Sequence, residues 1–106
     1  MIARTWRGAV RAADADAYLA YLNAVGTPSY TAVPGNLGVV TLRRLVDDRA
    51  EFLLLSFWES EAAVRAFAGP DTEHAVFYPE DDRFLIDRDE HVTHYEVVER
   101  TGPVPA

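Results

Sequence analysis

Apolar and polar residues alternate with two different periods along this chain of 106 residues. Two segments, residues 15–25 and 61–68, repeat apolar side chains every three or four positions, as the buried face of a helix does. Four others show the β-branched, aromatic and alternating patterns of strands: residues 2–10, 37–46, 51–59 and 91–99. The order strand, helix, strand, strand, helix, strand predicts an α+β fold, the ferredoxin-like βαββαβ arrangement with an antiparallel sheet.

Cap and turn residues set the expected boundaries of these elements. Asp14 is predicted to cap the first helix and Gly26 to stop it, so that residues 27–36 form a loop. Ser60 is predicted to cap the second helix, which ends at Gly69. The polar residues 47–50 lie between two strand patterns and predict a hairpin.

The last third of the chain has weaker signals. Residues 71–78 are expected to form a short helical turn that stops before Pro79. The acidic stretch at residues 80–90 is expected to be a solvated connection on the surface. We therefore expect one domain over residues 1–100, followed by a frayed tail at residues 101–106.

The strand pattern at residues 51–59 is apolar on both faces, which bears on oligomeric state. Phe52, Leu54 and Trp58 point to one side of the sheet. Leu53, Leu55 and Phe57 point to the other side. Two helices cover only one face of such a sheet, and a chain this short has no further element for the second face. A second copy of the chain is the simplest cover, so the sequence predicts a homodimer.

Charge and composition exclude several classes of function. The net charge of −7 and the scattered arginines disfavour nucleic acid as a partner. No apolar run approaches the roughly 20 residues of a membrane span, and no secretory signal pattern is visible, so we expect a soluble cytoplasmic protein. The sequence has no cysteine and no lysine, which excludes thiolate catalysis and lysine Schiff bases.

Several motifs together resemble a known family. These are MIARTWRG, PGNLGVVTLRR, LLLSFWESEAAVRAFAG and THYEVV, which span residues 1–99 with the hairpin between them. The arrangement is similar to the antibiotic biosynthesis monooxygenase family of dimeric α/β-barrel proteins. The resemblance implies two sheets paired across a dimer axis and a pocket between each sheet and its helices. It also implies activities such as cofactor-independent oxygenation of polycyclic phenols or quinols, haem degradation, or quinol oxidation.

The haem-degrading branch of that family can be compared residue by residue. Its pattern has an asparagine on the first strand, a tryptophan on the second helix and a histidine further along as the iron ligand. The corresponding neighbourhoods of this sequence hold Trp6, Phe67 and Phe77. The resemblance therefore favours chemistry without haem, and no cofactor is expected.

Candidate catalytic residues are His74 and Tyr78. Four positions apart on a helical turn, they would share one face and could hold a proton-transfer site. The alternative is that Tyr78 packs in the core while His74 is solvated. The neighbouring acids Glu80, Asp81 and Asp82 lack the spacing of a calcium loop and are expected to be solvated.

Candidate substrate-binding residues lie on the predicted strands and on the second helix. Arg4 and Trp6 share a strand face, where they could stack on an aromatic substrate and steady an enolate or phenolate. Alternatively, Trp6 is core and Arg4 pairs with a carboxylate such as Glu96. His94 could face the pocket or the dimer interface. The remaining candidates, more often core than site, are Trp58 and Phe67.

The three histidines lack a clear metal-ligand spacing, although His91 and His94 with an acid stay an alternative, and no metal is expected. The sequence thus predicts a small-molecule monooxygenase-like protein that acts on an aromatic or enolisable substrate without a cofactor. The alternative function is a ligand-binding or assembly module of the same fold; haem binding is the third.

Overall fold

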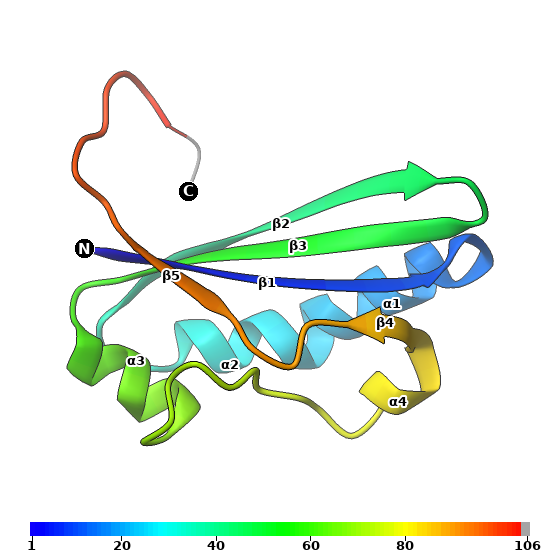
Figure 1. Cartoon of the computed structure of the whole chain (residues 1–106), viewed down its shortest axis with the longest axis horizontal. Helices are drawn as coiled ribbons and strands as arrows, with labels where there is room; N and C mark the ends of the chain where they lie inside the picture. The colour runs from blue at the N-terminus through cyan, green and yellow to red at the C-terminus, as the bar shows by residue number, and fades with distance from the viewer. Residues whose placement is uncertain (105–106) are drawn as a thin grey trace.

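All the helices lie on one side of an antiparallel sheet in the computed structural model of the protein (Figure 1). The structure describes residues 1–104, and residues 105 and 106 of the predicted tail lie outside the described residues. The strand order is β2-β3-β1-β4, and β5 also pairs with β1. The predicted α+β, ferredoxin-like fold is confirmed. The strands are β1 (Ile2–Arg11), β2 (Asn36–Val46), β3 (Arg49–Trp58), β4 (Leu85–Arg88) and β5 (Thr93–Glu96).

The hairpin between β2 and β3 forms where the sequence predicts it. Val46 pairs with Arg49, which leaves only Asp47 and Asp48 in the turn. Asp47 has a φ of 55°, a left-handed conformation that aspartate tolerates better than most residues do. The hairpin then runs from Val46 back to Asn36, so the pattern of polar turn residues between β-rich runs located it correctly.

The outer edge of the sheet beside β1 is shared by two short strands. β4 pairs with β1 near Gly8 and Val10, and β5 pairs with β1 from Ile2 to Thr5. The predicted strand at residues 91–99 was therefore too long, and the predicted acidic connection contains β4 and a short helix, α4 (Asp81–Phe84). Phe84 and Leu85 are buried, and this apolar pair anchors the segment to the sheet.

The first helical region extends further than predicted. It comprises η1 (Ala12–Asp14), α1 (Ala15–Tyr21), η2 (Leu22–Gly26) and α2 (Thr27–Thr31). Gly26 keeps right-handed helical angles, and Pro28 lies in the first turn of α2, where its missing N–H costs nothing. The predicted stop at Gly26 and loop at residues 27–36 were wrong for this reason. The Asp14 side chain makes no capping hydrogen bond and pairs with Arg11 instead.

The second predicted helix is α3 (Glu61–Ala68), and its boundaries are confirmed. The Ser60 hydroxyl accepts a hydrogen bond from the Ala63 amide, and Gly69 ends the helix with a φ of 87°. The helical turn expected at residues 71–78 does not form. This segment is irregular, and His74 makes an isolated β-bridge with His91, so long-range pairing replaced local helix geometry.

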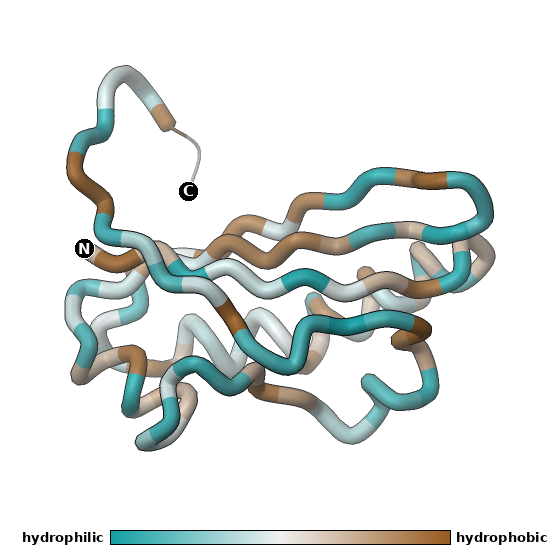
Figure 2. Tube along the Cα trace, viewed as in Figure 1, coloured by the Kyte–Doolittle hydropathy of each residue, from teal (hydrophilic) through white to brown (hydrophobic). Residues whose placement is uncertain are grey.

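The two faces of the sheet differ in burial. On the helix side, Phe52, Leu54 and Trp58 of β3 are buried in the core. On the opposite side no helix of residues 1–104 covers β3 (Figure 1). The apolar residues 53, 55 and 57 therefore stay partly exposed. Figure 2 shows apolar stretches along both strands of the hairpin. On this open face, Leu42 opposite Leu53 is 44% exposed and Tyr95 is 57% exposed.

None of the helices within residues 1–104 combines the length and the apolar character needed to cross a lipid bilayer.

Candidate functional site

The buried guanidinium of Arg4 lies between the sheet and the segment that follows α3. Arg4 is 2% exposed and projects from β1 toward the helices. Its Nη1 donates to the carbonyl oxygen of Thr72 at 2.6 Å, and its Nη2 donates to that of His74 at 3.0 Å. No carboxylate of residues 1–104 forms an ion pair with it. Burial lowers the pKa of Arg4, as expected for a cation removed from water.

His94 completes the contacts of this guanidinium. Arg4 and His94 are paired across β1 and β5, and Nη1 lies 3.0 Å from His94 Nε2. Arginine can only donate, so Nε2 must accept and the ring must be neutral. Burial, and then the Arg4 charge, lower the pKa of His94. The predicted alternative, a pair between Arg4 and Glu96, is wrong because the β1–β5 register places Glu96 opposite Ile2.

Aromatic side chains pack around Arg4. The Phe67 ring centroid lies 5.6 Å from the Arg4 guanidinium carbon. Phe67 also packs against Trp58 at 5.1 Å and against Tyr30 at 4.4 Å between ring centroids. The Trp58 indole is fully buried, and its Nε1 donates to Ser56 Oγ at 2.9 Å. Of these two predicted substrate-binding residues, Trp58 thus belongs to the core, and Phe67 is partly buried and packs against it.

Trp6 forms the wall next to this cluster. It lies on the same face of β1 as Arg4, as the sequence predicts, and its Nε1 donates to the Asp89 carbonyl at 2.9 Å. A Cβ atom at Gly8 would come 2.5 Å from the Trp6 ring, so glycine at that position makes room for the indole. Phe77 packs edge-on against Trp6 at 6.4 Å. Trp6 is therefore held in one orientation by its neighbours.

Tyr78 points into the interior of the protein. Its hydroxyl forms a hydrogen bond with Ser29 Oγ, which itself donates to the Gly26 carbonyl at 2.6 Å. Because a serine hydroxyl has one proton, Tyr78 is the donor toward Ser29. Burial is the main cause that raises the pKa of Tyr78. Ser29 belongs to α2, so the unpredicted helical turn is what positions this partner.

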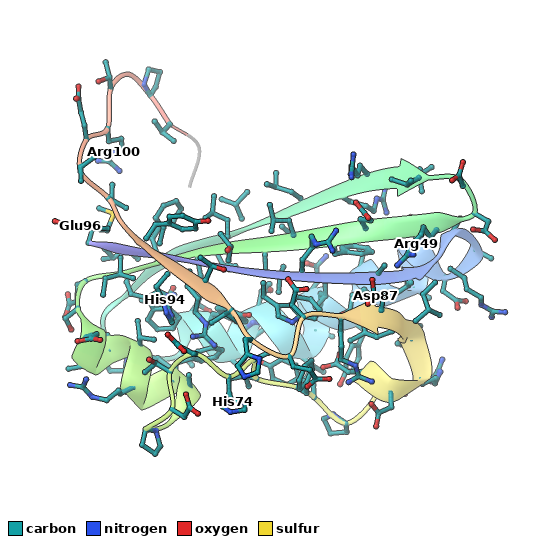
Figure 3. All side chains as sticks on the ribbon, in the orientation of Figure 1. Arg49, His74, Asp87, His94, Glu96 and Arg100 are labelled. Atoms are coloured by element: carbon teal, nitrogen blue, oxygen red, sulfur yellow. The ribbon has the colours of Figure 1, made fainter. Side chains whose placement is uncertain are left out.

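His74 does not join Tyr78. The His74 ring lies on the outside of the segment, where its Nε2 is 3.0 Å from Asp71 Oδ2 and its ring centroid is 4.7 Å from that of His91. Figure 3 shows His94 beneath β5, beside α3, and His74 on the chain below it. The structure therefore separates the two predicted catalytic side chains, and only the His74 carbonyl reaches the interior cluster.

Asp81 is the acidic residue whose placement the sequence did not reveal. Its two neighbours are exposed: Glu80 pairs with Arg83 at 2.6 Å, and Asp82 pairs with Arg88 at 2.5 Å. Asp81 between them is only 3% exposed, so the expectation that all three acids are solvated was wrong for this one. Its Oδ2 accepts the Tyr78 amide at 2.7 Å. Burial raises the pKa of Asp81, and the Tyr78 amide opposes that shift.

Little empty space remains inside this cluster. A gap of about 10 Å³ lies between the sheet and the helices, close to the size of one water molecule. A wider hollow of about 250 Å³ opens at the surface beside α3 and β5. His94 and Thr72, both partners of Arg4, line this hollow. Eight residues line the inner gap: Trp6, Tyr18, Leu22, Tyr30, Leu54, Val76, Tyr78 and Asp81.

Within the part of the chain that the structure describes, no three histidine, aspartate or glutamate side chains gather as metal ligands would.

Sequence comparison identifies the family of this fold. The family model for antibiotic biosynthesis monooxygenases matches residues 1–76. The chain belongs to the antibiotic biosynthesis monooxygenase family. The resemblance seen in the sequence motifs is thus confirmed. A comparison with curated proteins gave no match.

Solved structures with the antibiotic biosynthesis monooxygenase fold resemble this chain over nearly its whole length. A candidate antibiotic biosynthesis monooxygenase from Bacillus cereus has 17% identity and a TM-score of 0.68, with 99% of this chain and 98% of that chain covered. A second one, from Deinococcus radiodurans, has 15% identity and a TM-score of 0.67, with coverages of 99% and 100%. The haem-degrading protein MhuD of Mycobacterium tuberculosis, with two haems in its active site, has 22% identity and a TM-score of 0.62, with coverages of 96% and 100%.

Proposed function

We propose that this member of the antibiotic biosynthesis monooxygenase family binds a planar, largely apolar small molecule with an acidic hydroxyl, and oxygenates it without a bound redox cofactor. The observation that carries the proposal is the buried Arg4 guanidinium, which meets carbonyl oxygens and a neutral imidazole but no carboxylate of residues 1–104. A bound phenolate or enolate would supply the missing counter-charge, and charge-assisted hydrogen bonds to such an oxyanion are strong.

The surroundings of Arg4 favour a planar ligand. Phe67 presents its ring to the guanidinium, and Tyr30 packs against that ring. Flat aromatic walls gain most from stacking on another flat ring. The hydroxyl of Tyr78 is near enough to Arg4 for the guanidinium to act on its pKa, so it could orient a substrate oxygen held there.

The reaction needs no group beyond the substrate and dioxygen. Arg4 would stabilise the substrate oxyanion, and the aromatic walls would exclude water from it. The electron-rich anion can pass an electron to dioxygen, and coupling of the two forms a carbon–oxygen bond. Loss of water then leaves a carbonyl, so that a phenol and dioxygen give a quinone and water. The enzyme supplies orientation and charge stabilisation.

Substrate binding requires the inner gap to widen. The irregular segment at residues 71–78 covers this part of the sheet, and two of its carbonyls bind Arg4. An anionic ligand would compete with those carbonyls for the guanidinium. The hollow beside His94 would be the route of access, because His94 and Thr72, which both contact Arg4, line it. The catalytic roles predicted for His74 and Tyr78 stay predictions.

We further propose that the protein is a homodimer that buries the open face of the sheet. Leu53 of β3 and Leu42 of β2 lie opposite each other on this face, and Tyr95 of β5 extends it. A hollow of about 230 Å³ lies on the same face, where Arg7 and Arg44 both pair with Glu51 at 3.3 Å and 2.7 Å. An apolar centre with a charged rim suits a self-complementary interface.

A binding or assembly module without catalysis is the second candidate. The observation in its favour is the packing of the interior, where the gap measures about 10 Å³ and Trp58 is fully buried. An enzyme needs an accessible cavity with convergent polar groups. The two candidates therefore differ in whether a ligand opens the interior and reacts there.

Oxygen uptake with 1-naphthol tests the proposed function. We expect one dioxygen consumed for each 1,4-naphthoquinone formed, with Arg4→Met abolishing the reaction. Arg11→Met on the same strand is the matched control, because Arg11 is exposed and pairs only with Asp14, and it should retain the rate. Equal rates in folded Arg4→Met and wild type would refute the role of Arg4. Binding of naphthol without oxygen uptake would instead establish the module.

A further inference from the structure

Asp81 has one carboxylate oxygen that is buried without a well-aligned hydrogen-bond donor among residues 1–104. Its Oδ2 accepts the Tyr78 amide at 2.7 Å, whereas its Oδ1 is buried and accepts no well-aligned hydrogen bond within residues 1–104. The residue is 3% exposed, so solvent does not compensate. Buried polar atoms are nearly always satisfied, and an exception calls for an explanation.

The groups around Asp81 are phenols rather than cations. The Tyr18 hydroxyl lies near enough to lower the pKa of Asp81, and burial of Tyr18 beside this carboxylate raises the pKa of the phenol. Arg88, whose charge lowers the pKa of Asp81, is itself paired with Asp82 at 2.5 Å. Asp81 also lines the inner gap together with Trp6 and Tyr78. The carboxylate is therefore next to the space where the proposed function puts a substrate.

We propose that Asp81 is the proton acceptor of this site. The inference rests on the proposed function and extends it. The substrate O–H bond breaks, its proton moves to Asp81 Oδ1, and its electron pair stays on the oxygen, which Arg4 then stabilises. A carboxylate and a neutral phenol become a carboxylic acid and a phenolate, so the net charge of the site does not change. No redox step is involved in this transfer.

Two phenols lie within range of both charges of the site. Arg4 lowers and Asp81 raises the pKa of Tyr30 and that of Tyr78, so both hydroxyls are close enough to each charged group to respond to it. A neutral weak acid suits such a site, because it binds without adding charge and ionises only there. A carboxylic acid arrives already ionised and would be repelled by Asp81. The substrate class is accordingly neutral phenols or enols, and carboxylates are rejected.

Binding of 4-nitrophenol tests this assignment, because its phenol and phenolate forms absorb at different wavelengths. At a pH about one unit below the pKa of the probe, nine-tenths or so of the free probe is protonated. Wild type should bind it as the phenolate without releasing a proton, measured by calorimetry in two buffers of different ionisation heat. Asp81→Asn, which has no carboxylate to take the proton, should release about one proton to the buffer for each phenol that it binds as the phenolate. Its amide oxygen can still accept the Tyr78 N–H, which preserves the local fold.

Asp82→Asn is the matched control, since it makes the same change at an exposed neighbour, and it should behave as wild type. An Asp81→Asn protein that binds the phenolate without releasing a proton would overturn the role of Asp81 while leaving the site intact. Release of one proton when wild type binds would overturn it without any variant. Failure of wild type to bind the probe would instead count against the proposed function.

Discussion

The Arg4 guanidinium and the His94 imidazole face each other on adjacent strands, with Nη1 3.0 Å from Nε2. This contact requires a neutral histidine, because a protonated ring would turn a second donor toward a cation. Burial and the Arg4 charge both lower the pKa of His94 below its ordinary value of 6.5. Protonation of His94 would therefore break its contact with Arg4, the central residue of the candidate site.

Stability should therefore fall on mild acidification. With its pKa lowered in the fold, His94 contributes stability that is fully present above 6.5 and is lost as the pH falls from there toward the folded-state pKa. Urea unfolding from about pH 7.5 to about pH 5.5 should show a larger loss in wild type than in His94→Gln, whose amide oxygen accepts from Arg4 without titrating. Equal losses in both proteins would contradict this account.

Arg4→Lys should destabilise the protein although it keeps the charge. A lysine ammonium lacks the planar fork that reaches the carbonyls of Thr72 and His74 together. Leaving one buried carbonyl unpaired costs about 1–3 kcal/mol, which chemical unfolding would resolve. Arg11→Lys, on an exposed ion pair of the same strand, should change the unfolding free energy by less than about 0.5 kcal/mol. A similarly small effect at Arg4 would mean that its two carbonyl contacts are dispensable.

Leu53→Glu should dissociate the proposed homodimer. A charge in the middle of the open face would be buried without a partner, which should raise the dimer dissociation constant by about 100-fold or more. Sedimentation velocity over a dilution series measures the change. Leu45→Glu is the control, because Leu45 lies near the exposed hairpin turn and is 68% exposed. Wild type that sediments as a monomer at micromolar concentration would refute the dimer itself.

Two glycines with positive φ should respond differently to alanine. Gly69 has a φ of 87° and open space where a Cβ would go, so Gly69→Ala should cost only backbone strain, about 1–2 kcal/mol. Gly35 has a φ of 94°, and a Cβ there would come 2.6 Å from Ala63 Cβ. Gly35→Ala should therefore cost at least about 1 kcal/mol more. Thermal or urea unfolding of both variants measures the difference, and equal losses would show that α3 shifts without cost.

The sequence predicted the elements whose signals are local. Ser60 caps α3 through a bond to Ala63, three residues away, and Gly69 ends the same helix. The hairpin turn likewise depends on adjacent residues at 47 and 48. Residues 71–78 failed as a predicted helix because their backbone pairs with residues near 91, and a pattern confined to eight residues carries no sign of that contact.

In the candidate site, too, the features set by neighbouring residues were predicted and those set by distant contacts were not. Strand alternation correctly put Arg4 and Trp6 on one face, because that relation is set by neighbouring residues. The burial of Asp81 was missed, since it depends on Tyr18 in α1 and on Tyr78, and its acidic neighbours Glu80 and Asp82 are solvated. A buried phenylalanine at position 84, one turn later, is the one local sign that this stretch turns inward.

The shared edge beside β1 has a consequence for local opening. β4 and β5 each hold only part of β1, and the chain between them carries the Asp89 carbonyl that binds Trp6. Amide hydrogens along the β1–β3 ladder, which is paired over the full length of both strands, would exchange with deuterium only upon global unfolding. The amide hydrogens of β5 could exchange through a local opening that releases β5 and His94 from β1 while β4 stays paired. The amides of β5 and those of the β1–β3 ladder would then exchange at separate rates.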